Sequence, residues 1–225
     1  MTAYDKNALR ELVKPDRVHK DFYTSPEVFD LEMERIFGRA WLFVGHASQV
    51  PNPGDYITTT IARQPIIMSR HRDGEVHVMF NRCTHRGSQV CLEQFGNTNK
   101  FECPYHAWVF NTDGSFVGAP YPKGYEKGFL EKEELDLVKI PRTAMYRGFV
   151  FGSLADDGPD IFEFIGPMKE HIDAFVDRSP DGEVEACAGM FRYRFDANWK
   201  LQMENQTDVY HIMFTHVSTT DDDGK

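Results

Sequence analysis

Four residues capable of binding a metal occur in two closely spaced pairs. Cys83 and His85 form the first pair, Cys103 and His106 form the second, and 17 residues separate His85 from Cys103. Each pair joins a soft thiolate to an imidazole, and transition metals bind both kinds of ligand well. The spacing therefore predicts one metal centre that is shared between two tight loops.

The arrangement of these ligands distinguishes two kinds of centre. A structural zinc site usually groups two Cys residues and then two His residues around one ion. A Rieske [2Fe–2S] cluster instead takes two Cys on one iron and two His on the other. Because each pair here contains one Cys and one His, the sequence favours the cluster, and a zinc knuckle is the alternative. Visible absorption bands and acid-labile sulfide would distinguish the two.

A second group of potential ligands lies between Asn198 and His216. If this segment begins as a helix, Glu204, Asp208 and His211 are spaced at i, i+4 and i+7 and share one face. His216 is five residues beyond His211, so the two imidazoles meet at one metal only if the helix bends or ends between them. Ordinary core or surface histidines are the alternative for both positions.

Predicted strands position the two Cys/His pairs. Asp73-Gly74 and Asp113-Gly114 are typical hairpin turns, and Thr and Ile dominate the strand that begins at Tyr56. We expect an antiparallel meander with both ligand loops at one end. Its strands are predicted at 56–62, 65–69, 76–80, 108–110, 115–117, 137–140 and 148–151.

Helices are predicted on either side of this meander. Residues 1–37 are polar and mainly helical in pattern, with a helix start at Pro26, and residues 161–176 carry apolar side chains at helical spacing. Asp156 to Pro159 has the composition of a linker. Strict alternation over 191–196 predicts a half-buried strand of a second sheet.

Composition excludes several functions. A length of 225 residues suits one or two domains, and a net charge of −10 argues against nucleic acid or an anionic membrane as partner. We expect no secretory leader and no membrane span, because no apolar run is long enough. Four Cys without a disulfide pattern indicate a reducing cytoplasm, and Cys91 and Cys187 are predicted to be small core residues.

Three motifs in this order carry a resemblance to a known family. They are C-T-H-R-G from Cys83, C-P-Y-H-A-W from Cys103 and N-W-K-x-x-x-E-N-x-x-D-x-Y-H-x-x-x-x-H from Asn198. Together they resemble the large (α) subunit of Rieske non-haem iron aromatic-ring-hydroxylating oxygenases. The likeness implies an α+β chain: a helical arm at 1–37, an antiparallel all-β Rieske [2Fe–2S] domain at 38–156, and the beginning of an α+β helix-grip (START-like) catalytic domain at 157–225.

The resemblance also implies the site residues. Cys83, His85, Cys103 and His106 would bind the [2Fe–2S] cluster, and His211 and His216 would bind a mononuclear Fe(II). In the family, a carboxylate from much further along the chain completes a facial triad of ligands. This third ligand is expected to be absent from the present chain, which we interpret as a partial α subunit.

The implied electron path passes between subunits. Electrons from NAD(P)H would reach the cluster through a reductase, with or without a ferredoxin, and would cross from His106 to Asp208 of a neighbouring chain. Such a path predicts a homotrimer, or an α3β3 assembly with a small β subunit, that uses O₂ to hydroxylate an aromatic substrate. Glu204 and Asn205 are expected either to position the helix or to line the approach to the iron.

Other functions remain open at the level of sequence. A Rieske monooxygenase or demethylase would use the same iron site. A non-catalytic Rieske electron carrier is the alternative from another class, although a carrier has no need of the ligands between Asn198 and His216. Near the cluster, Arg86 and Tyr105 are candidates for packing or hydrogen bonding, Gly87 for a tight loop, and Trp108 for either core packing or shielding.

Overall fold

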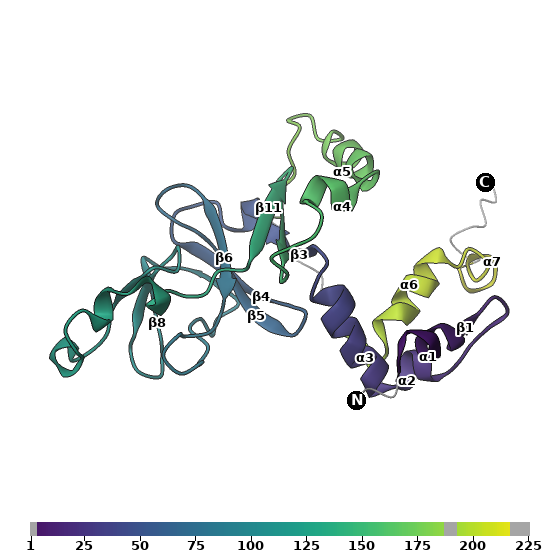
Figure 1. Cartoon of the computed structure of the whole chain (residues 1–225). Helices are drawn as coiled ribbons and strands as arrows, with labels where there is room; N and C mark the ends of the chain where they lie inside the picture. The colour runs from purple at the N-terminus through teal and green to yellow at the C-terminus, as the bar shows by residue number, and fades with distance from the viewer. Residues whose placement is uncertain (1–3, 187–192, 217–225) are drawn as a thin grey trace. The chain divides into compact units, whose positions relative to one another are not determined.

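The computed structural model describes residues 4–186 and 193–216, and contacts within the chain divide it into two compact units (Figure 1). The larger unit is Met33–Met190, and the smaller unit combines Met1–Glu32 with Phe191–Lys225. Within the described residues, no helix has both the length and the apolar character needed to cross a bilayer.

Three small antiparallel sheets make up the larger unit. Their strand orders are β6-β5-β4-β7, β10-β9-β8 and β11-β12-β3. The bounds are β3 Leu42–His46, β4 Asp55–Ile61, β5 Gln64–Arg70, β6 Val76–Phe80, β7 Phe95–Asn97, β8 Lys100–Glu102, β9 Val109–Asn111, β10 Phe116–Gly118, β11 Arg142–Tyr146 and β12 Phe149–Ser153. These strands confirm the predictions at 56–62, 65–69, 76–80, 108–110, 115–117 and 148–151.

The predicted single meander is wrong in two respects. β12 pairs with β3, which lies about a hundred residues earlier in the chain, so the third sheet is not built from consecutive strands. The segment 137–140 forms only an isolated bridge, between Lys139 and Met79 of β6, in place of a strand. This segment still bonds to the edge strand β6, because the N–H of Phe80 donates to the carbonyl of Val138 (2.9 Å).

Tight two-residue turns set the register of two hairpins. Ala62 and Arg63 join β4 to β5 with φ of 45° and 69°, and Arg147 and Gly148 join β11 to β12 with φ of 50° and 85°. Positive φ at both central residues gives the turn a twist that matches the twist of the flanking strands. Ala62-Arg63 lacks the Asn-Gly or Asp-Gly pattern, so this turn gives no signal in the sequence.

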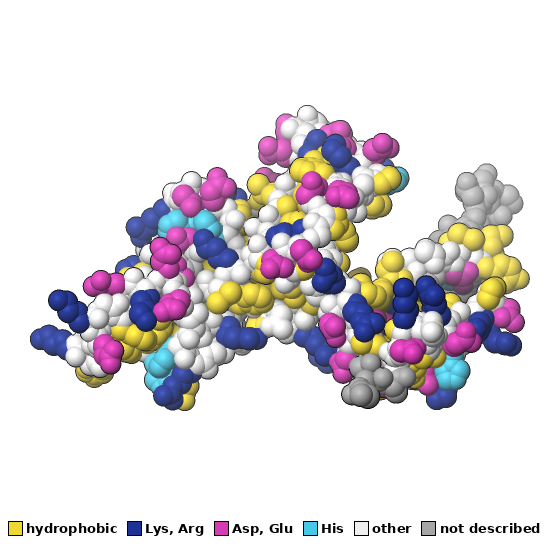
Figure 2. Space-filling model, viewed as in Figure 1, with side chains coloured by type: hydrophobic (Ala, Val, Ile, Leu, Met, Phe, Trp, Pro, Cys, Tyr) yellow, Lys and Arg dark blue, Asp and Glu magenta, His cyan; other side chains and the backbone are white. Residues whose placement is uncertain are grey.

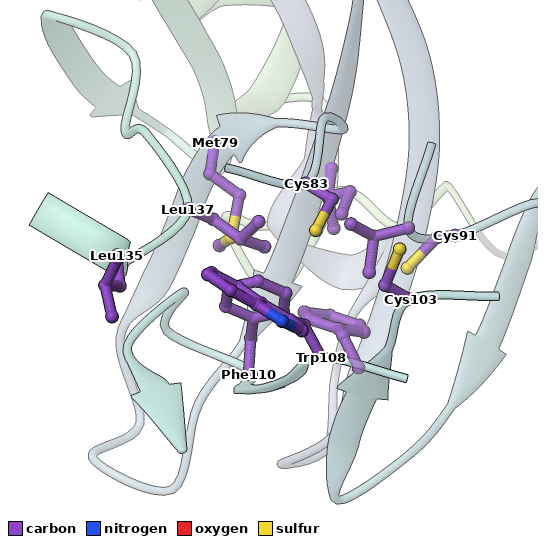
Figure 3. Close-up of a cluster of buried hydrophobic side chains, with 11 residues drawn as sticks. Met79, Cys83, Cys91, Cys103, Trp108, Phe110, Leu135 and Leu137 are labelled. Atoms are coloured by element: carbon purple, nitrogen blue, oxygen red, sulfur yellow. The ribbon is translucent and has the colours of Figure 1, made fainter. Parts of the chain in front are cut away.

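The core of the larger unit consists of two hydrophobic clusters. One cluster packs β3, β4, β5, β6 and β12 together through Val44, Val50, Ile57, Ile61, Ile66, Met68, Val78, Ile140 and Val150. The other lies beneath the two ligand loops and contains the cysteines (Figure 3); its members are Ile67, Met79, Cys83, Val90, Cys91, Phe101, Cys103, Trp108, Phe110, Leu135 and Leu137. The predicted ligand loops are therefore anchored directly on the hydrophobic core.

Two helices follow β12. α4 is Ile161–Ile165 and α5 is Met168–Val176, so the helix predicted over 161–176 is interrupted. Gly166 has φ of 47°, and Pro167 has no N–H to continue the helical hydrogen bonds. Short 3₁₀ turns complete the unit: η2 Ala47–Gln49, η3 Pro122–Gly124, η4 Phe129–Glu131 and η5 Glu133–Leu135.

The smaller unit joins the beginning of the chain to its later part. Its elements are α1 Lys6–Glu11, β1 Val13–Lys14, β2 Arg17–Val18, α2 Asp21–Thr24, α3 Pro26–Glu32, α6 Trp199–Thr207 and α7 Ile212–Thr215. The helix start at Pro26 is confirmed, whereas the short β1–β2 ribbon was not predicted. After α3 the chain continues into the larger unit through a π-helical turn, η1 Met33–Phe37.

The strand predicted at 191–196 is not present in its described part, residues 193–196. Residues 193–196 have no strand structure, and 191 and 192 lie outside the described residues. Alternation of aromatic and charged side chains is therefore insufficient here, because a strand also needs a neighbour with which to pair.

Candidate metal centre

The first ligand loop follows β6 and turns tightly around Cys83. The N–H of Cys83 donates to the carbonyl of Ser88 (2.8 Å), and the N–H of Gly87 donates to the carbonyl of Cys83 (2.8 Å). Gly87 has φ of 75°, in the left-handed region that glycine enters without a steric penalty. The glycine in this loop therefore has the conformational role that we predicted for it.

The second ligand loop joins β8 to β9 and repeats the same pattern. The N–H of Cys103 donates to the carbonyl of Trp108 (2.8 Å), and the N–H of Ala107 donates to the carbonyl of Cys103 (2.9 Å). Ala107 occupies the position equivalent to the glycine of the first loop and also has positive φ, 51°. The two loops are thus two copies of one turn, each beginning at a Cys and containing a His.

The side chains of the two pairs meet between these loops. The ring centroids of His85 and His106 are 4.8 Å apart, with the ring planes at 65°. Cys83 and Cys103 are each 2% exposed. The Nδ1 atoms of both imidazoles are buried and have no hydrogen-bond partner among the described residues. The structure therefore brings the four predicted ligands together and leaves two of their nitrogen atoms unused.

Burial controls the protonation of these groups. It raises the pKa of the Cys83 thiol to about 11, and the adjacent Cys103 thiol adds to this effect, although the backbone N–H groups of His85 and Arg86 oppose it. Burial also lowers the pKa of His85, with His106 and Arg86 contributing in the same direction. Without a metal Cys83 is thus a neutral thiol, and metal binding at this residue would release a proton.

The environments of the two imidazoles differ. The Trp108 ring is stacked on His85, with centroids 4.7 Å apart and planes within 6°, and Trp108 is only 2% exposed. Trp108 therefore belongs to the hydrophobic core (Figure 3) and also covers one face of His85. The ring over His106 belongs to Tyr105, which lies 3.9 Å away between centroids but is 59% exposed. The ring packed on His106 is thus exposed and the ring packed on His85 is buried, while both imidazoles are themselves half-buried.

Sequence reasoning missed two residues that hold the first loop. Oδ1 of Asn81 accepts from the N–H groups of Val90 and Cys91 (2.9 Å each), and its Nδ2 donates to the carbonyl of Cys91 (2.7 Å). The hydroxyl of Thr84 donates to the carbonyl of Leu135 (2.6 Å). A buried Asn at the end of a strand was the available signal, since buried amides need several partners.

The second group of predicted ligands lies in the smaller unit and is only partly assembled. The helix α6 ends at Thr207, and Asp208 is extended, so the predicted single helical face of Glu204, Asp208 and His211 is wrong. Oδ2 of Asp208 nevertheless lies 3.4 Å from Nδ1 of His211, without hydrogen-bonding geometry. The rings of His211 and His216 approach to 5.5 Å across the short helix α7.

The two residues predicted to position the helix or line the approach to the iron are both exposed on α6. The carboxylate of Glu204 accepts a hydrogen bond from the hydroxyl of Tyr23 (2.6 Å), which ties α6 to α2. This contact favours the positioning alternative for Glu204. Asn205 is exposed, and no contact distinguishes its two alternatives.

Comparison with known proteins gives the family. Residues 40–139 match the Rieske [2Fe-2S] domain. The anthranilate 1,2-dioxygenase large subunit of Acinetobacter baylyi is 44% identical over 201 residues, which are 89% of this chain and 42% of that protein. This chain belongs to the α-subunit family of Rieske aromatic-ring-hydroxylating oxygenases. Its antiparallel β domain with additional helices makes it an α+β member of that family.

Two further relatives show the breadth of this oxygenase family. The N,N-dimethyl phenylurea N-demethylase subunit alpha of a Sphingobium species is 37% identical over 208 residues, covering 92% of this chain and 44% of that protein. The crystal structure of naphthalene 1,2-dioxygenase from Rhodococcus sp. bound to indole has a TM-score of 0.83 and 40% identity, covering 91% of this chain and 46% of that one. The chain thus spans less than half the length of these relatives.

The residues of the Rieske domain fit a [2Fe–2S] cluster. Two buried thiols face two imidazoles whose Nδ1 atoms lack partners, which is the donor set that such a cluster takes. No three His, Cys, Asp or Glu side chains in 4–186 and 193–216 are arranged to hold one metal ion. A cluster has no need of such convergence, because its ligands are divided between two irons. This geometry favours the cluster over the zinc knuckle.

Proposed function

We propose that Cys83 and Cys103 hold one iron of a [2Fe–2S] cluster and that His85 and His106 hold the other. The observation that carries this proposal is the pair of buried, partnerless Nδ1 atoms facing two buried thiols across matching loops. When bound, the cluster supplies one-electron transfer. The stacked Trp108 covers His85, whereas the ring packed on His106 is that of the exposed Tyr105, so His106 would be the side on which electrons leave.

Exchange of one predicted ligand for serine tests the cluster. In the full chain purified with its cofactor, Cys83→Ser should abolish the visible absorption bands and the acid-labile sulfide. The matched control is Cys91→Ser, because Cys91 is a buried thiol of the same hydrophobic cluster and burial alone raises its pKa to about 12. This control should retain full iron and sulfide. Retention of the bands in Cys83→Ser, or a colourless zinc-containing wild type, would contradict the proposal.

The wider function that we infer is that of the oxygenase component of a Rieske ring-hydroxylating dioxygenase. His211 and His216 would hold a mononuclear Fe(II), which supplies O₂ activation when bound. The approach of the two rings to 5.5 Å supports this assignment, and the ring nitrogen of His211 that does not face Asp208 would be the one that binds the iron. The nearby carboxylate of Asp208 would orient the His211 ring and hold its proton, as carboxylates near metal-binding imidazoles commonly do.

The proposed partners follow from the same family membership. Electrons would originate from NAD(P)H and arrive through a reductase, with or without a ferredoxin. A head-to-tail homotrimer, or an α3β3 assembly with a β subunit, would place His106 of one copy beside Asp208 of the next. Residues 157–225 would begin a helix-grip catalytic domain. A reducing cytoplasm suits the free thiols of Cys83, Cys91 and Cys103.

The substrate that we propose is a small aromatic compound, and an aromatic carboxylate is the first to test. The most similar relative named above acts on anthranilate, as its name states. A second candidate function, oxidative N-demethylation or monooxygenation, is favoured by the 37% identity to an N-demethylase subunit. Mass spectrometry of products formed under ¹⁸O₂ by the complete enzyme separates them: a cis-dihydrodiol contains two labelled atoms, whereas a hydroxylated or demethylated product contains at most one.

A further inference from the structure

The helix α6 has almost no apolar contact surface within the smaller unit. Lys200 is its one buried residue, and the positions from Leu201 to Thr207 are all exposed. Figure 2 shows hydrophobic side chains gathered on the surface over α6 and α7; they include Met203, Met213 and Phe214. A helix is normally fixed by a buried apolar stripe. Something else must therefore hold α6 in its place on the N-terminal helices.

A buried polar clamp at the start of α6 performs this task. The ammonium of Lys200 forms an ion pair with Oε1 of Glu32, the last residue of α3, and the two side chains are 8% and 9% exposed. The other carboxylate oxygen of Glu32 accepts a hydrogen bond from the indole N–H of Trp199 (2.8 Å). The Lys200 ammonium also lies 4.5 Å from the centre of the Phe22 ring. The Glu32 carboxylate thus binds the side chains of two consecutive residues of α6.

Two weaker contacts extend the clamp along the helix. The side-chain amide of Asn198 donates to the carbonyl of Tyr23 (3.2 Å), while its oxygen caps α6 by accepting from the N–H of Lys200 (3.1 Å). One helical turn further on, the hydroxyl of Tyr23 donates to Glu204 (2.6 Å). Directional bonds at both ends of this turn fix the rotation and the axial position of α6, which an apolar stripe would leave freer to slide.

Hydrogen bonds in the segment between α6 and α7 fix the histidines relative to α6. The N–H of Asp208 donates to the carbonyl of Glu204 (2.9 Å), and Oδ1 of Asp208 accepts from the N–H of Tyr210 (2.8 Å). The carbonyl of His211 then accepts from the N–H of Thr215 (2.7 Å) at the start of α7. Local hydrogen bonds therefore fix much of the backbone between α6 and the two residues that carry the imidazoles.

We propose that Glu32, Lys200 and Trp199 are positioning residues that fix Asp208, His211 and His216 through the register of α6. That this positioning serves an iron site rests on the function proposed above. The clamp itself can be tested without iron. The N-terminal helices are then an integral support of the segment that carries the two histidines. Retaining a buried ion pair at this place is explained by register, since a pair of apolar side chains would stabilise the fold equally well.

Hydrogen–deuterium exchange in the full chain with its cluster tests the clamp. Glu32→Gln leaves the buried Lys200 ammonium without its counter-charge, so amide exchange over 199–216 should accelerate by about tenfold or more. Two reference segments, 6–18 in the same unit and 81–108 in the Rieske domain, should change by less than about twofold. The control is Glu11→Gln, which breaks an exposed ion pair with Lys14 (2.5 Å) in the same unit and should leave 199–216 unchanged.

A double variant separates register from mere stability. Glu32→Gln combined with Lys200→Met removes both charges, so the thermal midpoint should recover relative to Glu32→Gln alone. Exchange over 199–216 should remain fast, because the directional contacts are still missing, whereas Lys200→Arg should keep part of the protection. Restored protection in the double variant would overturn the proposal, as would exchange that rises equally in 6–18 or does not change in 199–216.

The proposed clamp and the proposed iron site can be contradicted by different results. Because the third iron ligand is expected outside the present chain, Fe(II) binding is measured on the complete α subunit by isothermal titration calorimetry under anaerobic conditions, with His211→Ala as the reference. A wild type that passes the exchange test but binds no Fe(II) keeps the clamp and removes the iron assignment. Fe(II) binding that is insensitive to Glu32→Gln, together with unchanged exchange, removes the clamp and keeps the iron.

Discussion

Asn81 holds the first ligand loop through three buried hydrogen bonds to main-chain groups of Val90 and Cys91. Asn81→Ala leaves two N–H groups and one carbonyl in the core without partners, and each buried unsatisfied group costs about 1–3 kcal/mol. We expect a loss of at least about 3 kcal/mol in the free energy of unfolding, measured in urea. Asn97→Ala, at an exposed Asn, is the control and should cost less than about 1 kcal/mol. Equal losses in the two variants would contradict this role.

Residue type and spacing were sufficient to find the four side chains of the cluster site but not their supports. Cys83 and Cys91 are both buried, and only the presence of a His two residues later distinguished the candidate ligand from the core thiol. The roles of Asn81 and Thr84 depend on backbone groups that are 9 or more residues away. No spacing rule applies to such contacts, because any main-chain group can serve as partner.

Each ligand loop requires a residue in the left-handed conformation four positions after its cysteine, Gly87 in the first loop and Ala107 in the second. Gly87→Ala would place a Cβ in open space, 3.9 Å from the nearest atoms of Arg82, so backbone conformation alone should set its cost. We expect a loss of about 1 kcal/mol in unfolding free energy with the cluster retained, since Ala107 already tolerates φ of 51° in the second loop. Gly118→Ala, at negative φ and also in open space, should be neutral. Loss of the cluster in Gly87→Ala would refute this interpretation.

The break between α6 and α7 shows what helical periodicity overlooks. A shared face of Glu204, Asp208 and His211 required one helix to continue through His211, and α6 does begin at Trp199 with Asn198 as its cap. Asp208 then turns its side chain back to accept from the N–H of Tyr210, a local bond that competes with helix continuation. His211 and His216 both lie after this break, at the two ends of the one-turn helix α7, and their rings approach to 5.5 Å.

At the scale of the whole molecule, the unpredictable feature is the pairing of distant segments. Strands β4, β5, β6, β9 and β10 could be predicted because each has a local pattern and a hairpin partner nearby in sequence, whereas the pairing of β3 with β12 spans about a hundred residues. The smaller unit depends on contacts such as that between Glu32 and Lys200, which are 168 residues apart. Two charged residues at that distance resemble any other surface charges in the sequence, and only the fold reveals that both are buried.

The proposed path of electrons gives the test that belongs to the whole assembly. Asp208→Asn keeps the shape of the side chain and its hydrogen bond from Tyr210 but removes the charge that faces Nδ1 of His211. In the complete enzyme with its reductase, we expect the cluster spectrum to be unchanged and substrate turnover to fall by roughly 10- to 100-fold or more, since the charge would orient the imidazole and carry the link to His106 of the neighbouring copy. Asp16→Asn, at an exposed carboxylate of the same unit, is the control and should retain turnover.

Stopped-flow oxidation of the reduced cluster in the presence of substrate and O₂ locates the defect. Slow oxidation in Asp208→Asn supports the link between subunits, whereas a normal rate with unchanged turnover would discard it.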